Sequence, residues 1–231
     1  MNPNDPNVPA LELVVAKLGV LTSELVLVGG CSVGLLITDR ARPPVRPTED
    51  VDMVTQVVTL TAYHQIQERL RACGFKEAKE EGAHIFRWRN GNLILDVMPS
   101  GVDFGHSSNR WYPEAIKSAM PYTLPSGSNV RLIAAPLFIA TKFEAFQDRG
   151  QGDYSHHDIE DIVNVVDGRS ELMEEIAQAP REVQDFLKDE FDGLLANEAF
   201  HDRLPWHLHG DAGSQARAFI VVSRMRVLAG L

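Results

Sequence analysis

The sequence predicts an α+β protein: a mixed sheet flanked by helices in residues 1–130, followed by a helical region in residues 131–231. Short runs at 25–28 and 51–55 have the length and composition of strands. The pair Asn90-Gly91, between two further strand-like runs, indicates a β-hairpin. Helical patterns prevail after about residue 134. Strands therefore precede helices along the chain, an order typical of this fold class.

In the first 60 residues we expect a loosely packed polar tail (1–9), a helix (10–19), a buried strand (25–28), a short helix (32–38), an extended basic loop (40–47) and a second strand (51–55). Gly19 suits the C-terminal cap of the first helix. Gly29 and Gly30 mark the end of the first strand. The loop is expected to be extended because each proline biases the residue before it away from the helical region.

The rest of the chain predicts a helix (60–73), the two strands of the hairpin (84–89 and 92–98), a loop-rich segment (100–128), and helices at 134–149, at 155–166 and intermittently to the end. The hairpin is the clearest local signal, because Asn90-Gly91 suits a type I′ turn of two residues. With that turn, Asp96 would lie opposite Ile85 and share a face of the sheet with Arg87.

Composition indicates a globular protein of the cytoplasm. The N-terminus lacks the basic and apolar regions of a secretory signal, and no apolar run approaches the roughly 20 residues of a membrane helix. Two cysteines make no disulfide framework. The net charge is -10, and residues 151–231 carry 7 Lys+Arg against 16 Asp+Glu, which gives -9 of it. An acidic second part argues against broad DNA binding, although a nucleotide or a short RNA end fits.

Three aspartates form the main candidate site. Asp50 and Asp52 lie at i and i+2 on a predicted strand, so their side chains point to one face. Asp96 interrupts the apolar second strand of the hairpin, where an acid is costly to bury without a partner. Neighbouring carboxylates repel each other unless a positive charge lies between them. Oxygen ligands favour Mg²⁺ or Mn²⁺ over zinc, and phosphoryl transfer needs such metals.

Upstream of these acids, Val28-Gly29-Gly30-Cys31-Ser32 joins the first strand to a short helix. Glycines at this place let the backbone approach a phosphate, and the N-terminus of a helix favours an anion. The segment is no P-loop, since Gly-Lys-Ser or Gly-Lys-Thr does not follow it.

This order of blocks resembles the signature of the polymerase-β nucleotidyltransferase superfamily, over roughly residues 25–166. Gly-Gly follows a strand, Asp-x-Asp lies on the next strand, and a lone Asp lies on a later one. The gap from Gly30 to Asp50 is longer than in the compact versions, and it carries Arg46 and Thr48 just before the acids. This long gap is similar to the AbiEii/AbiGii toxin branch.

That branch also carries a lysine on a downstream helix and an Asp-x-x-Asp helix after it, which Lys142 and Asp158 resemble. The resemblance implies that Gly29, Gly30 and Ser32 contact the triphosphate of an NTP. It also implies that Lys142 neutralises phosphate charge and that Asp158 helps to shape the nucleotide site. The helical domain (131–231) would then complete the active-site cleft.

For the acids, the resemblance implies that Asp50 and Asp52 bind both Mg²⁺ (or Mn²⁺) ions. Asp96 would complete one metal site and act as base on the acceptor hydroxyl. The implied reaction transfers a nucleoside monophosphate from an NTP to an RNA end or a protein hydroxyl. It also implies that the enzyme acts as a toxin beside an antitoxin partner.

Plainer interpretations stand beside these. Asp96 could be a structural partner of Arg87, and Lys142 could be a solvated helix lysine. Ser155 and Asp158 have a spacing like a capping box, so Asp158 could cap a helix. The pair His156-His157 invites a zinc site, but a surface pair fits better because no His/Cys set surrounds it. For the whole protein, the alternatives are transfer to a small-molecule acceptor, as in antibiotic-modifying enzymes, and non-catalytic nucleotide binding.

Overall fold

The structure is a computed structural model that describes residues 4–57, 59–80, 84–101 and 109–231. The chain forms two compact units. The sheet unit consists of Asp5–Ser32 and Arg46–Ala134, and the helical unit contains Val33–Val45 and Ala135–Leu231. The segment Val33–Val45 therefore belongs to the helical unit by its contacts, although it interrupts the sheet unit along the chain. The amides of Thr38 and Asp39 both donate to the carbonyl of Gly168, at 3.0 and 2.9 Å, and so attach this segment to the helices.

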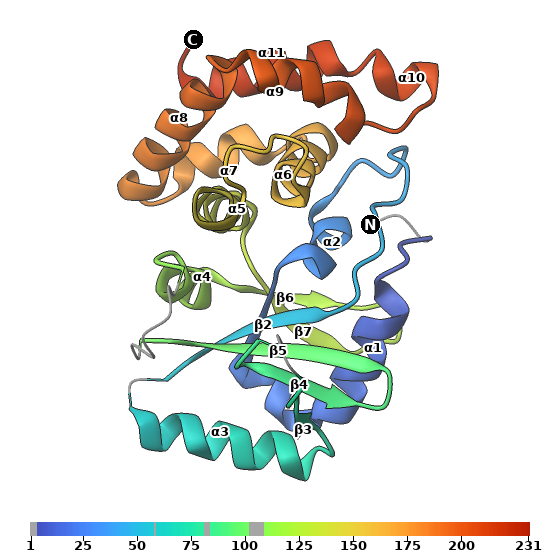
Figure 1. Ribbon diagram of the computed structural model, residues 1–231, viewed down its shortest axis with the longest axis vertical. Coiled ribbons are helices and arrows are strands. Elements are labelled where there is room, and N and C mark those ends of the chain that lie inside the picture. The colour runs from blue at the N-terminus through green and yellow to red at the C-terminus, as the bar shows by residue number, and fades with distance from the viewer. Residues whose placement is uncertain (1–3, 58, 81–83, 102–108) are drawn as a thin grey trace. The chain divides into compact units, whose positions relative to one another are not determined.

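In the described residues of the sheet unit, seven strands form one mixed sheet in the order β3-β4-β5-β2-β1-β7-β6 (Figure 1). The strands are β1 (Leu25–Val28), β2 (Val51–Gln56), β3 (Lys76–Glu77), β4 (Arg87–Asn90), β5 (Leu93–Ser100), β6 (Met120–Thr123) and β7 (Asn129–Leu132). β2 runs parallel to β5 and β1 runs parallel to β7, whereas the other neighbours are antiparallel. With its flanking helices and the helical unit, this sheet confirms the predicted α+β class.

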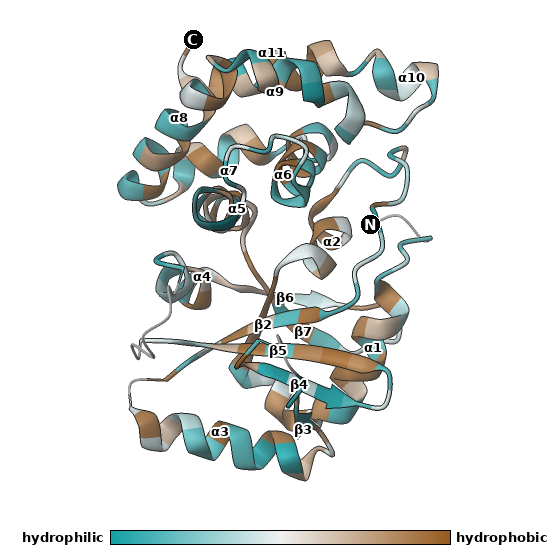
Figure 2. Ribbon diagram, in the orientation of Figure 1, coloured by the Kyte–Doolittle hydropathy of each residue, from teal (hydrophilic) through white to brown (hydrophobic). Residues whose placement is uncertain are grey.

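The helical segments of the sheet unit are α1 (Val8–Leu18), α3 (Leu60–Ala72), α4 (Tyr112–Ser118) and two 3₁₀ turns, η1 (Gly19–Glu24) and η2 (Gly30–Ser32). α1 packs against β5 and β2, and α4 packs against β2. The hydroxyl of Thr59 caps α3 by accepting from the amide of Ala62 at 3.1 Å. Figure 2 shows the contrast between β4, which is hydrophilic, and β5, which is largely hydrophobic. β4 carries Arg87 and β5 carries Asp96.

The N-terminal segment is better ordered than its composition suggests. α1 begins at Val8, so the prediction of a loose tail through residue 9 is wrong for its last part. Asn7 is 2% exposed, and its side chain holds the segment before β2. Its Nδ2 donates to the carbonyl of Arg46 at 3.1 Å, and its Oδ1 accepts from the amide of Thr48 at 2.8 Å. Composition could not reveal these long-range hydrogen bonds.

The loop-rich segment predicted at 100–128 also contains regular structure, since α4 and β6 lie within it. Pro113 lies in the first turn of α4, where its missing amide costs the helix nothing. Residues 102–108 of that segment lie outside the described residues. The turn residues of the segment were therefore a poor guide to how much of it is irregular.

The hairpin of β4 and β5 exists, but its register differs from the prediction. Asn90 pairs with Leu93, and Arg87, not Ile85, lies opposite Asp96. The turn residues are Gly91 and Asn92, and only Gly91 has a positive φ, at 60°. Glycine at the first central position is the type II′ arrangement, whereas type I′ needs positive φ at both positions. The difference of two residues keeps Arg87 on the face of Asp96.

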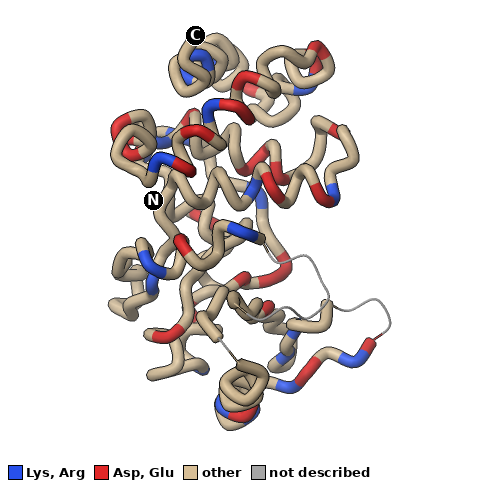
Figure 3. Tube along the Cα trace, turned by 90° about the vertical axis from the view of Figure 1, so that its left-hand side faces the viewer, with Lys and Arg blue, Asp and Glu red and all other residues tan. Residues whose placement is uncertain are grey.

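The helical unit contains α2 (Val33–Leu36), α5 (Ala135–Arg149), α6 (His157–Gly168), α7 (Leu172–Gln178), α8 (Arg181–Leu195), α9 (Glu198–Arg203), η3 (Leu204–His207), α10 (Ala212–Gln215) and α11 (Ala218–Ala229). α8 buries Val183, Leu187, Phe191 and Leu194, a spacing that forms one apolar stripe. The rings of Phe143 and Phe191 meet edge to face with centroids 5.1 Å apart. Acidic and basic residues are interspersed over these helices (Figure 3). Among the described residues, no helix is long and apolar enough to cross a membrane.

A buried ion pair attaches Val33–Val45 to α6. The guanidinium of Arg42 contacts the carboxylate of Asp167, whose side chain is fully buried. Arg217, which precedes α11, donates from Nε to the same carboxylate at 2.8 Å. Arg42 in the basic loop, which the resemblance places in the long gap before the acids, is therefore a structural residue of the helical unit.

We expect Asp167→Ala to lower the free energy of unfolding by ~3 kcal/mol, because it removes the buried carboxylate that faces two guanidinium groups. Urea denaturation followed by circular dichroism measures the change. The matched control is Asp185→Ala, which breaks an exposed pair with Arg181 and should cost at most about 1 kcal/mol. Equal losses in the two variants would contradict the prediction.

Candidate active site

The three aspartates singled out by the sequence lie together at one place in the sheet unit. β2 and β5 are parallel neighbours, and their register sets Asp52 directly beside Asp96. Asp50 immediately precedes β2. One carboxylate oxygen from each of the three residues lies within 4.8 Å of the others. The side chain of Asp96 is 8% exposed, whereas that of Asp50 is 29% exposed. The cluster is thus rooted in the sheet and accessible on one side.

Arg87 of β4 balances part of this negative charge. Its Nε donates to Asp96 Oδ1 at 2.9 Å, and its Nη2 donates to Asp96 Oδ2 at 2.7 Å. The same Nη2 donates to Asp50 Oδ2 at 2.6 Å. The hydrogen bonds to Asp96 raise the pKa of Arg87 above its ordinary value, so the guanidinium stays charged. The contact that the sequence suggested between Arg87 and Asp96 is present.

Asp52 lies so close to the backbone of residue 29 that this residue must be a glycine. Its φ is 67°, a left-handed backbone conformation that residues with a side chain rarely adopt. A Cβ at this position would lie 1.9 Å from Oδ2 of Asp52. The carboxylate of Asp52 therefore occupies the space that any other residue would need. Sequence reasoning singled out Gly29 because it expected a phosphate contact, which stays a prediction. The reason that the structure gives for this glycine is the carboxylate of Asp52.

Gly30 and Ser32 form the tight turn η2 that follows Gly29. The amide and the hydroxyl of Ser32 both donate to the carbonyl of Gly29, at 3.1 and 2.7 Å. Ser32 is fully buried, and Gly30 is buried as well. In the structure the hydroxyl of Ser32 holds the turn together. Contacts of Gly29, Gly30 and Ser32 with a triphosphate stay predictions.

Asn7 and Thr48 hold Asp50 at the entrance to β2. The hydroxyl of Thr48 donates to the carbonyl of Asp50 at 3.2 Å, and the amide of Thr48 donates to Asn7 at 2.8 Å. Sequence reasoning missed Asn7, because it placed this residue in a loosely packed polar tail (1–9) and not beside a helix. Here it precedes α1 but makes no cap hydrogen bond with its side chain.

The donor set of the three aspartates fits a hard divalent cation. Mg²⁺ is held by oxygen ligands at about 2.0–2.1 Å, so ligand oxygens around it lie about 3 Å apart. The carboxylate oxygens need to close only modestly from their present limit of 4.8 Å. The three carboxylates, two of which pair with Arg87, carry an excess of negative charge that a divalent cation would neutralise. Asp50, Asp52 and Asp96 are therefore the residues that could hold a metal.

Lys142 and Asp158, the other predicted site residues, pair with each other inside the helical unit. Nζ of Lys142 lies 3.0 Å from Oδ1 of Asp158 and 2.7 Å from Oδ2 of Asp161. Lys142 is 5% exposed and Asp158 is fully buried, so the interpretation of Lys142 as a solvated lysine is wrong. Arg149 adds two hydrogen bonds to Asp158, at 2.8 and 2.9 Å.

Asp158 is not the cap of α6. The N-cap is His156, whose Nδ1 accepts from the amide of Asp158 at 3.2 Å. The capping-box interpretation is therefore wrong, because the carboxylate of Asp158 faces cations instead. Burial alone would raise the pKa of Asp158, but hydrogen bonds from Arg149 and the charge of Lys142 lower it below its ordinary value. Asp158 is ionised throughout the physiological range.

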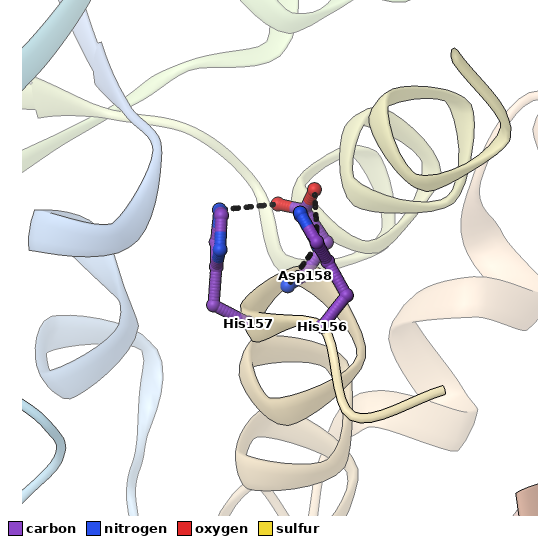
Figure 4. A group of neighbouring side chains, drawn as sticks. All are labelled: His156, His157 and Asp158. Atoms are coloured by element: carbon purple, nitrogen blue, oxygen red, sulfur yellow. Dashed lines mark hydrogen bonds and ion pairs between the residues drawn. The ribbon is translucent and has the colours of Figure 1, made fainter. Parts of the chain in front are cut away.

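His156, His157 and Asp158 form a second cluster of metal-ligand types. Figure 4 shows both imidazole rings beside the carboxylate of Asp158. The centroids of the two rings lie 4.0 Å apart. Nε2 of His157 lies 3.7 Å from Asp158 Oδ1, and burial lowers the pKa of His157 to about 4. Because Lys142 and Arg149 already contact the same carboxylate, a metal ion here would be repelled by two cations. The cluster fits a structural ion network.

Comparison with solved structures shows which known fold the chain resembles. An antigenic nucleotidyltransferase-like protein from Paracoccidioides brasiliensis matches 83% of this chain and 90% of its own, with a TM-score of 0.51 and 19% identity. The chain of 231 residues that we describe therefore has a nucleotidyltransferase-like fold. ANT(2″)-Ia in complex with adenylyl-2″-tobramycin matches 78% of this chain and 93% of its own, at 15% identity and a TM-score of 0.45.

A putative nucleotidyltransferase from H. pylori matches 100% of this chain and 96% of its own, at 12% identity and a TM-score of 0.45. No family model matches the sequence, and no curated protein matches it significantly. The likeness to nucleotidyltransferases is therefore one of three-dimensional structure. None of these neighbours points to the AbiEii/AbiGii branch.

We expect Gly29→Ala to weaken Mn²⁺ binding by roughly 10-fold or more, because the new methyl group displaces the carboxylate of Asp52. Titration calorimetry measures the affinity. The matched control is Gly127→Ala, which has the same backbone strain at a φ of 85° but no atom within 4 Å of its Cβ. If both variants bind Mn²⁺ as the wild type does, the spatial requirement at Gly29 is refuted.

We expect Lys142→Met to lower the free energy of unfolding by ~3 kcal/mol, because it removes the buried ammonium between two buried carboxylates. Chemical denaturation at pH 7 measures the loss. Arg149→Met is the comparison, since its side chain is 49% exposed and its removal should cost only about 1 kcal/mol. A larger loss for Arg149→Met would count against this account.

Proposed function

We propose that this protein is a metal-dependent nucleotidyltransferase that transfers a nucleoside monophosphate from an NTP to an acceptor hydroxyl. The observation that carries the proposal is the meeting of three aspartates in a nucleotidyltransferase-like fold: Asp52 and Asp96 lie on adjacent parallel strands, and Asp50 lies just before one of them. A purely structural cluster would gain nothing from three mutually repelling acids at a partly exposed place. Phosphoryl transfer requires this kind of oxygen-rich site.

In the proposed reaction, the acceptor oxygen forms a bond to the α-phosphorus while the bond from that phosphorus to the bridging α–β oxygen breaks. Pyrophosphate leaves, and the proton of the acceptor hydroxyl passes to the carboxylate of Asp96. Asp50 and Asp52 would hold both Mg²⁺ ions, and Asp96 would complete one metal site. Bound magnesium would supply charge neutralisation on the phosphate oxygens and align the reacting groups. The chain's part is to fix the three carboxylates on a rigid sheet.

The proposed roles of the remaining residues rest on the sequence resemblance. Gly29, Gly30 and Ser32 would contact the triphosphate through a backbone that approaches closely. Lys142 would neutralise phosphate charge, and Asp158 would help to shape the nucleotide site. The ion pairs of Lys142 and Asp158 with each other support a charged state for both residues.

For the acceptor, we propose an RNA end or a protein hydroxyl. The long gap before Thr48 and the helices that carry Lys142 and Asp158 resemble the toxin branch, in which an antitoxin accompanies the enzyme. Residues 151–231, with 7 Lys+Arg against 16 Asp+Glu, carry a charge of -9, which fits a short RNA end better than an extended RNA backbone. A small-molecule acceptor is the second candidate that the test must separate.

The test is incubation with each α-labelled NTP and Mg²⁺, in separate reactions with total RNA, with protein and with an aminoglycoside. We expect label to pass to RNA or protein, and Asp52→Asn to reduce the rate on the order of 100-fold or more through the loss of a metal ligand. The matched control is Glu49→Gln, which removes an equal charge from the exposed residue beside Asp50 and should leave the rate within a few fold.

Transfer by Asp52→Asn at the wild-type rate would refute the metal assignment. Label that passes only to the aminoglycoside would replace the proposed acceptor with a small molecule. No transfer from any NTP to any of the three acceptors, with folded protein, would count against catalysis and favour a non-catalytic nucleotide-binding protein.

A further inference from the structure

A single nitrogen of Arg87 bridges two of the three candidate metal ligands. Nη2 lies 2.6 Å from Oδ2 of Asp50 and 2.7 Å from Oδ2 of Asp96. Nε of the same guanidinium lies 2.9 Å from the second oxygen of Asp96. The positive group thus takes the place between these carboxylates where a shared cation would be held.

A metal ion and this guanidinium compete for the same oxygen atoms. A cation bound by both Asp50 and Asp96 would lie about 2.1 Å from an oxygen of each. Nη2 already lies within hydrogen-bond distance of one oxygen of each residue. Two cations this close in a partly buried site repel each other strongly. One of the contacts of Arg87, the bridge to Asp50, must therefore open when a metal binds both residues.

Without metal, the bridge keeps the site assembled. The register of β2 and β5 forces Asp52 and Asp96 side by side, and Asp50 lies on the same side. Three carboxylates this close repel one another, and Asp96 is buried, which makes an unpaired charge costly. Arg87 offsets one charge and fixes the orientation of two side chains through its forked geometry.

Arg87 is partly accessible to solvent. Its side chain is 21% exposed. A guanidinium released from Asp50 is suited to the phosphates of a nucleotide, which it binds in a bidentate manner. The negative charge that Arg87 gives up on the protein is then replaced by negative charge on the nucleotide.

We propose that Arg87 acts as a stand-in for the metal, holding Asp50 and Asp96 together in the metal-free protein and moving to the nucleotide phosphates when metal and NTP bind. This inference rests on the proposed function and names Arg87 as the positioning residue of that site. It makes metal and nucleotide binding cooperative, because the nucleotide provides the partner for the group that the metal displaces. By linkage, each ligand strengthens the binding of the other by the same factor.

The plainer account is that Arg87 is a permanent structural partner of Asp96. In that case its removal would loosen the site and weaken metal binding, with and without nucleotide. The stand-in role has the opposite consequence in the absence of nucleotide. Removal of the competing cation leaves three carboxylates that attract a divalent ion more strongly. The sign of the change in metal affinity therefore separates the two accounts.

The experiment is a Mn²⁺ titration of the wild type and Arg87→Gln, followed by the spin-resonance signal of free Mn²⁺, with and without a non-hydrolysable NTP analogue. We expect Arg87→Gln to bind Mn²⁺ at least about 5-fold more tightly without nucleotide and to lose most of the strengthening that the analogue causes in the wild type. Its melting temperature without metal should fall, and Mn²⁺ should raise it by more than in the wild type.

The matched control is Arg89→Gln. Arg89 lies on the same strand and the same face, but it pairs with the exposed Glu80. This variant should bind Mn²⁺ as the wild type does. If Arg87→Gln does not fold, Arg87→Lys replaces it, because a lysine keeps the charge but lacks the fork that bridges Asp50 and Asp96. The lysine variant should show a smaller gain in Mn²⁺ affinity than expected for glutamine.

Mn²⁺ binding that is unchanged or weaker in the folded Arg87 variant, beside measurable binding in the wild type, would overturn the role of Arg87 and leave the proposed function intact. An equal gain in Arg89→Gln would also overturn it, since the effect would then be general charge. Absence of Mn²⁺ binding in the wild type and in both variants, with and without the analogue, would overturn the metal site and the inference together.

Discussion

Asp50, Asp52 and Asp96 repel one another electrostatically, and the strand pairing of the sheet unit holds them together against this repulsion. The parallel pairing of β2 and β5 places Asp52 beside Asp96, and the pairing of β4 with β5 brings Arg87 opposite Asp96. The turn after β1 then has to leave room for a carboxylate, which is why its first residue is glycine. The order of the strands, their register and the left-handed conformation of Gly29 together place the three aspartates and Arg87 beside one another.

The helical unit handles buried acids in a different way. Asp158 and Asp161 face the buried ammonium of Lys142, and Asp167 faces two guanidinium groups. In each case the cations come from other segments of the same unit, so the charges are balanced and little is exposed. In the sheet unit, Asp50 and Asp96 share the single guanidinium of Arg87, and the cluster has an accessible side. This difference in charge balance and access distinguishes a candidate metal site from structural ion pairs.

The fold and the carboxylates support each other as arguments for function. A nucleotidyltransferase-like fold hosts proteins of different activity, so the fold alone does not name a reaction. Three carboxylates alone are common without a metal. The place of Asp52 and Asp96 on adjacent parallel strands of this fold, with Asp50 just before one of them, supports the proposal of phosphoryl transfer at a divalent metal. Neither the fold nor the three carboxylates specify the acceptor, because acceptor choice depends on other surfaces of the protein.

The sequence by itself determined the fold class, the strands that carry the acids and the hairpin that carries Asp96, because these depend on local apolar patterns and turn residues. It also identified Gly29 and the face shared by Arg87 and Asp96. It did not determine the register of the hairpin, since Asn90-Gly91 and Gly91-Asn92 are both acceptable turns and cross-strand contacts choose between them.

Only the tertiary structure decided the remaining features. The hydrogen bonds of Asn7 join segments that are distant in sequence. The burial of Lys142 and the cation partners of Asp158 arise where the consecutive helices α5 and α6 pack together. From its sequence neighbours, Asp158 looks like a helix cap and Lys142 like a solvated lysine. Both become buried members of an ion pair when another helix packs against them. Such contacts depend on the packing of the whole unit, which no local pattern encodes.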